Sequence, residues 1–116
     1  MKTSSAKAKG RNLQKYVCTC ILQLFKSLQP DDCTSRSMGA GGEDLLLSPT
    51  ARKLLPISIE CKSHARYSVY KDYEQASANA GKYEPIVIIK QNHSRPLAIM
   101  DLNYFLELLY DKNKEA

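Results

Sequence analysis

The sequence predicts an α/β protein in which a mixed β-sheet is flanked by helices, with the element order α-β-β-β-α-β-β-α. Three observations support this fold class. Apolar residues recur three and four positions apart near both ends of the chain, as on one face of a helix. Between these segments lie short apolar runs, and residues 85–90 (PIVIIK) are nearly all apolar, as in a strand covered on both faces. Glycine and proline separate the runs and mark turns.

The first predicted helix spans residues 11–28, and Pro30 ends it because proline lacks the N–H that a helix needs. Its expected buried face consists of Leu13, Val17, Cys20, Ile21, Leu24 and Leu28. Two short strands, 33–38 and 43–48, are expected next. The glycines between positions 39 and 42 predict the tight turn that joins them.

Ser48 is a suitable helix cap and Pro49 a suitable first helical residue, so a short helical turn is expected there. A strand over residues 57–62 and a helix over residues 69–80 follow, and Gly81 ends that helix.

Residues 96–100 form the last predicted strand, after the strand at 85–90. Asp101 then caps the final helix. The apolar face of this helix is expected to be buried, and it consists of Leu102, Phe105, Leu106 and Leu109.

The chain of 116 residues is long enough for one domain with one hydrophobic core. Residues 1–10 carry basic side chains and almost no apolar ones, so we expect a flexible basic arm there and a single folded domain over residues 11–116. The net charge of +5 favours a polyanionic partner such as DNA or RNA. No stretch approaches the roughly 20 apolar residues of a membrane span, and no signal-peptide pattern is present, so we expect a soluble, cytoplasmic protein with no membrane partner.

The four cysteines form no C-x-x-C pair and have no matching histidine spacing, which argues against a zinc site. Free and mostly buried thiols are therefore expected.

Glu60 and Lys62 carry the most informative pattern in the sequence. Because strand side chains alternate, these two residues share one face of the predicted strand, opposite Ile59 and Cys61. One interpretation is a solvent-exposed ion pair, which contributes little. The other is half of a metal-dependent phosphodiesterase site.

Asp44 favours the second interpretation, because it follows a glycine turn at the start of the neighbouring strand. Carboxylates from Asp44 and Glu60 could then converge on Mg²⁺, which takes oxygen ligands, and Mn²⁺ could substitute. The backbone carbonyl of Cys61 could add a ligand. Lys62 would orient a water molecule and offset phosphate charge.

These residues resemble a known pattern. Asp44 followed by Glu60-Cys61-Lys62 resembles the D…(D/E)-x-K signature of the PD-(D/E)XK nuclease superfamily. The segments AKGRNLQKYV, SRSMGAGGEDLLL and SIECK resemble, in order, the first helix, the hairpin and the catalytic strand of archaeal and phage Holliday-junction resolvases. The resemblance covers about residues 8–110, and GEDLLLSP and EQA also resemble small phage nucleases.

The resemblance implies a restriction-endonuclease-like fold and a Mg²⁺-dependent endonuclease that cuts branched DNA in recombination, as a homodimer. It implies that Asp44 and Glu60 hold the metal, that Lys62 is the catalytic lysine and that Gln75 lies near the site. Gln14 stands where the resolvases have a metal-assisting glutamate, so the metal is held less tightly or Glu43 assists. A phage-encoded protein of this kind would act in the cytoplasm of the host cell.

The predicted DNA-binding residues are Lys7, Lys9, Arg11, Arg36, Ser37 and His64. For Arg36 the alternative is an ordinary strand-end arginine, and for His64 a solvated loop histidine. Three other functions stay open at this point: a related nuclease acting on linear, flap or mismatched DNA, a basic DNA-binding module without catalytic activity, and a basic protein that binds polyanions in general.

Overall fold

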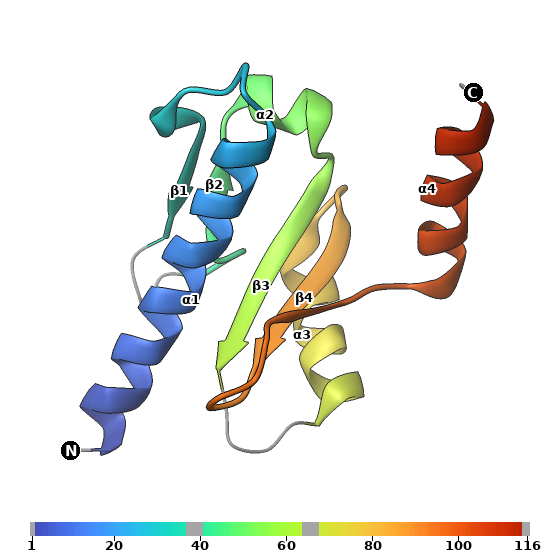
Figure 1. Ribbon diagram of the computed structural model, residues 1–116. Coiled ribbons are helices and arrows are strands. Elements are labelled where there is room, and N and C mark those ends of the chain that lie inside the picture. The colour runs from blue at the N-terminus through green and yellow to red at the C-terminus, as the bar shows by residue number, and fades with distance from the viewer. Residues whose placement is uncertain (1, 37–40, 64–67, 115–116) are drawn as a thin grey trace.

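The protein has a mixed α/β fold, seen in a computed structural model that describes residues 2–36, 41–63 and 68–114 (Figure 1). The described part of the chain contains four α-helices and two small sheets. The helices are α1 (Lys2–Leu24), α2 (Pro49–Leu54), α3 (Val69–Ala80) and α4 (Leu102–Lys114), with a short 3₁₀ turn at Pro30–Asp32. The strands are β1 (Cys33–Ser35), β2 (Leu45–Leu47), β3 (Ile57–Ser63), β4 (Glu84–Lys90) and β5 (Leu97–Ile99). No helix within these described ranges is long and apolar enough to cross a membrane.

The predicted element order is confirmed, but the strands form two sheets and not one. β3 pairs in parallel with β4, and β4 pairs antiparallel with β5, so this sheet is mixed as expected. β1 and β2 form a separate antiparallel hairpin. Each hairpin strand is only three residues long, and β2 approaches β3 through a backbone hydrogen bond of 2.9 Å from the Asp44 N–H to the Ile59 carbonyl.

α1 begins earlier and ends earlier than predicted. It continues through residues 2–10, the segment for which the sequence predicts a flexible arm. Alanine and lysine dominate that segment, and both are favourable in helices. The expected buried face is partly wrong, because Cys20 is exposed and Leu24 is 77% exposed, whereas Cys18 is buried.

α2 and α3 begin and end where the local signals predict. The Ser48 hydroxyl accepts a hydrogen bond of 3.1 Å from the Ala51 N–H, as expected for an N-cap. α3 ends at Gly81, whose φ of 60° lies in the left-handed region that favours glycine. Ala76 and Ala80 are buried, which lets α3 pack closely on β3 and β4.

The hydrophobic core lies between α1, the hairpin and β3. Its buried members are Leu13, Cys18, Cys33, Leu45, Ile59 and Cys61. All four cysteines are free thiols, and three of them are buried, which confirms the prediction. Because Ile59 and Cys61 face this core, the side chains of Glu60 and Lys62 lie on the opposite face of β3, toward α3.

α4 departs most from the prediction. It stands at the end of an extended segment, apart from the sheets (Figure 1). None of its described residues is buried. The four residues expected to form its buried face are exposed, at 67% for Leu102, 44% for Phe105, 50% for Leu106 and 42% for Leu109. The periodicity correctly predicts the helix, but a helical pattern does not determine which surface covers it.

Candidate metal-dependent site

Asp44 is held at the edge of β3 by two backbone contacts. Its N–H donates to the Ile59 carbonyl at 2.9 Å, and its carboxylate oxygen Oδ2 accepts from the Cys61 N–H at 2.7 Å. The side chain thus substitutes for a backbone carbonyl in the ladder. Because the turn before β2 ends at Asp44, the sequence places this carboxylate beside the strand that carries Glu60.

Glu60 and Lys62 lie on the α3 side of β3 and are not a solvent-exposed pair. The side chain of Glu60 is 7% exposed and that of Lys62 is 16% exposed, and their Oε2 and Nζ atoms are 3.3 Å apart. Lys62 Nζ also donates to Gln75 Oε1 at 2.7 Å. The interpretation as a surface ion pair is therefore wrong, and the structure places Gln75 next to Lys62.

Burial is the largest influence on both carboxylates. It raises the pKa of Glu60, and the nearby charge of Asp44 raises it further, whereas Lys62 and Asn79 lower it. Burial also raises the pKa of Asp44, opposed by the Cys61 N–H and by the charges of Lys62 and Arg36. Asp44 and Glu60 are thus close enough to repel each other, and their ionised forms would be stabilised by an additional positive charge.

The oxygen atoms around this pair fit a divalent cation. Glu60 Oε1 is buried and has no hydrogen-bond partner among the described residues, which is costly for a carboxylate oxygen unless a cation neutralises it. The N–H and C=O of one strand residue project to the same edge of the strand, so the Cys61 carbonyl points to the same side as its N–H, toward Asp44. Carboxylate and carbonyl oxygens are ligands that Mg²⁺ takes.

This donor set is small. Within residues 2–36, 41–63 and 68–114, no group of three or more His, Cys, Asp or Glu side chains is arranged to hold a metal ion. Two carboxylates and a carbonyl would leave the remaining positions to water and to substrate phosphate, the arrangement that Mg²⁺ commonly adopts.

Gln14 is buried, at 4% exposure, on the helix that packs along β3. Arg36 is partly buried, and its Nε donates to the Glu43 carbonyl at 2.5 Å, so its guanidinium is held next to the turn that presents Asp44. Ser37 and His64, both predicted to bind DNA, lie outside the described residues.

The basic residues of α1 face solvent. Lys7, Lys9 and Arg11 are all exposed. Lys9 also lines a groove of about 600 Å³ between α1 and the ends of β3 and β4, together with Asn12, Tyr16, Ser63 and Lys90. Ser63 directly follows Lys62, so this groove, here called the basic groove, begins beside the candidate site.

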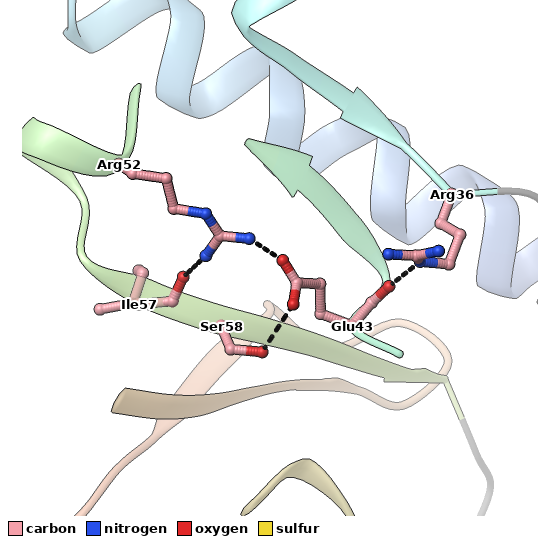
Figure 2. Close-up of polar contacts among 5 residues, drawn as sticks. All are labelled: Arg36, Glu43, Arg52, Ile57 and Ser58. Atoms are coloured by element: carbon pink, nitrogen blue, oxygen red, sulfur yellow. Dashed lines mark hydrogen bonds and ion pairs between the residues drawn. The ribbon is translucent and has the colours of Figure 1, made fainter. Parts of the chain in front are cut away.

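Glu43 is not available to assist a metal ion. Figure 2 shows its carboxylate between Arg52 of α2 and Ser58 of β3. Arg52 forms an ion pair with it and also donates to the Ile57 carbonyl at 2.7 Å, while the Ser58 hydroxyl lies 3.5 Å from the other carboxylate oxygen. The suggestion that Glu43 substitutes for a missing glutamate is therefore wrong, because its charge is already neutralised.

Two contributing residues were missed from the sequence. Arg52 anchors the segment before Asp44 through Glu43, and Asn79 approaches Glu60 from α3. The signal for Asn79 was present, since it follows Gln75 by four positions and therefore lies on the same face of the helix. No local pattern connects Arg52 to Glu43, because that contact arises only when α2 packs beside β3.

Comparisons with known protein families, with curated proteins and with solved structures found no match to this chain.

Proposed function

We propose that the protein is a Mg²⁺-dependent DNA endonuclease of the PD-(D/E)XK type, with a restriction-endonuclease-like fold and Holliday-junction resolvase-like activity. The observation that carries this proposal is the buried Glu60 carboxylate oxygen that lacks a hydrogen-bond donor among the described residues, next to Asp44 and Lys62. Two buried acids beside one lysine are a costly arrangement in a protein that binds no cation.

Asp44, Glu60 and the Cys61 carbonyl would hold the metal ion, and Mn²⁺ would substitute for Mg²⁺. When bound, the ion would supply a Lewis acid for a phosphoryl oxygen and lower the pKa of water. The chain's own residues orient the reactants. The Cys61 N–H fixes the direction of the Asp44 carboxylate, and Asn79 acts on Glu60 in the same way.

Lys62 is positioned to act on the substrate. Its ammonium group is held between Glu60 and Gln75, which leaves its side chain 16% exposed. An ammonium fixed in this way stabilises negative charge that develops on a phosphate without having to reorganise first. Gln75 is a positioning residue, since its contact is with Lys62.

The charge distribution favours DNA as the substrate. Lys7, Lys9 and Arg11 are exposed along α1, and the basic groove leads from this helix to Lys62. Cationic side chains in such a row bind phosphate groups and release counterions. Cutting both strands of a four-way junction would require two such sites, hence a homodimer.

The test is cleavage of a synthetic four-way junction in Mg²⁺. Wild type should cut it, and Asp44→Ala and Lys62→Ala should each lose at least about 100-fold in rate, the scale of removing a charge-stabilising group. Lys53→Ala removes an exposed lysine of α2 and should cut like wild type. Cleavage that survives both site substitutions would show that the site is assigned wrongly.

Flap, mismatched and plain duplex substrates in the same assay separate a resolvase from a related nuclease. A second candidate, a DNA-binding module without catalytic activity, is favoured by the neutral buried side chain of Gln14. It predicts salt-sensitive junction binding and no product in either Mg²⁺ or Mn²⁺.

A further inference from the structure

One side of α4 is an unusually apolar surface. We define the apolar face of α4 as Leu102, Phe105, Leu106 and Leu109, which are between 42% and 67% exposed. Their spacing of three, one and three residues places all four side chains on one side of the helix. The charged residues Glu107, Asp111 and Lys114 fall on the opposite side.

The apolar face does not pack on the body of its own chain. Tyr104 is the one residue of α4, among those described, that is not exposed, and it lies on the side of the helix away from Leu102 and Leu106. Burial and the charge of Glu84 on β4 both raise the pKa of Tyr104, which places this side chain near the sheet. The helix therefore turns its tyrosine toward the body and its leucines outward.

Such a helix needs a covering surface. A helix of 13 residues is marginal in water unless an apolar face is packed. A contiguous apolar patch of this kind on an exposed element marks an interaction site.

The surface beside the apolar face is hollowed. A depression of about 370 Å³ is lined by Ala98, Ile99 and Met100, and by Leu102 and Phe105 of the helix itself. The described chain therefore presents an apolar ridge next to an apolar hollow, and the two share residues.

We propose that this surface binds the same surface of a second copy of the chain. An isologous two-fold contact requires a patch that is complementary to itself. The apolar face meets this requirement, because in an antiparallel pair of α4 helices Leu102 lies opposite Leu109 and Phe105 lies opposite Leu106. The hollow then receives side chains from the partner's helix. The proposal does not depend on the nuclease chemistry.

The available area is sufficient for a specific dimer. The exposed apolar side chains of this region also include Leu97, Leu108 and Tyr110, at 54%, 45% and 67% exposure. Together with the apolar face they amount to roughly 600 Å² per chain, against about 800 Å² per partner in a standard interface.

The first test measures molar mass by light scattering during size-exclusion chromatography. Wild type is expected at twice the chain mass of 13.0 kDa, and Phe105→Glu combined with Leu106→Glu at the chain mass. The control is Leu54→Glu on α2, which is 48% exposed and therefore closely matched, and it should stay dimeric. Circular dichroism checks that both variants are folded. A monomeric wild type, or a dimer that survives the double substitution, would overturn the proposal.

The second test measures the geometry, in a Cys20→Ser background that removes the exposed native thiol. Leu106→Cys lies near the expected two-fold axis and should form a disulfide-linked dimer under mild oxidation. Asp111→Cys lies on the opposite side of α4 and should not. Equal cross-linking at both positions, or cross-linking at Asp111 alone, would contradict the antiparallel contact.

Discussion

Replacing Glu60 with glutamine tests whether the two buried acids exist to hold a cation. Glutamine keeps the shape of the side chain and removes its charge. An ionised buried oxygen without a hydrogen-bond donor costs about 1–3 kcal/mol, and the contact with Lys62 offsets part of this cost. We expect Glu60→Gln to be about 1 kcal/mol more stable than wild type in EDTA at pH 7, a rise in melting temperature of about 4–5 °C.

The pH dependence of this difference follows from the raised pKa of Glu60. A group whose folded-state pKa is raised contributes stability that is fully present below its unfolded pKa and is lost as the pH rises through the folded value. Wild type and Glu60→Gln should therefore be similar in stability below pH of about 4. The variant should gain its advantage as the pH rises above that range.

Divalent cations should reverse the order. A ligand at ten times its dissociation constant stabilises the folded state by about 1.4 kcal/mol. Wild type should gain this increment in Mg²⁺ or Mn²⁺ and Glu60→Gln should not, as measured by thermal denaturation with and without EDTA. Glu74→Gln, which removes an exposed acid from α3, is the matched control and should behave like wild type. A variant less stable than wild type in EDTA would refute the argument from burial, and a variant that keeps the full cation shift would refute the metal site.

Three further substitutions test the frame of the site. Arg52→Ala leaves the Glu43 carboxylate, 13% exposed, without its cation, and should cost about 3–5 kcal/mol in urea unfolding, while exposed Lys53→Ala should stay within about 0.5 kcal/mol of wild type. Gly42→Ala should cost about 1–3 kcal/mol, because φ is +90° and the added Cβ would lie 3.3 Å from the Arg36 guanidinium; Gly41→Ala, with open space around it, should cost less than Gly42→Ala. Gln14→Glu adds a third buried carboxylate and should lower the melting temperature in EDTA but increase the rise caused by Mn²⁺, whereas an unchanged rise would place Gln14 away from the cation.

Local signals predicted the local structure well. The bounds of α3, the cap at Ser48 and the alternation of β3 all follow from neighbouring residues, and the structure confirms them. Proline, glycine and capping side chains act within one turn of the chain, so their effect can be read without knowing the fold.

Long-range contacts could not be predicted in this way. The separation of the hairpin into its own sheet, the ion pair of Glu43 with Arg52 and the exposure of α4 each depend on how distant segments meet. For the site, spacing indicated that Asp44 and Glu60 would approach each other, but not that Asp44 would bond to the Cys61 N–H. Periodicity shows that a helix has an apolar side and says nothing about which molecule covers it.

The bond from the Cys61 amide to the Asp44 carboxylate gives the protein a built-in spectroscopic probe. In a ¹⁵N-labelled sample, that single amide resonance should shift when the carboxyl group loses its proton and shift again when a cation is added. One peak would thus follow the ionisation and the loading of the site without any substrate present.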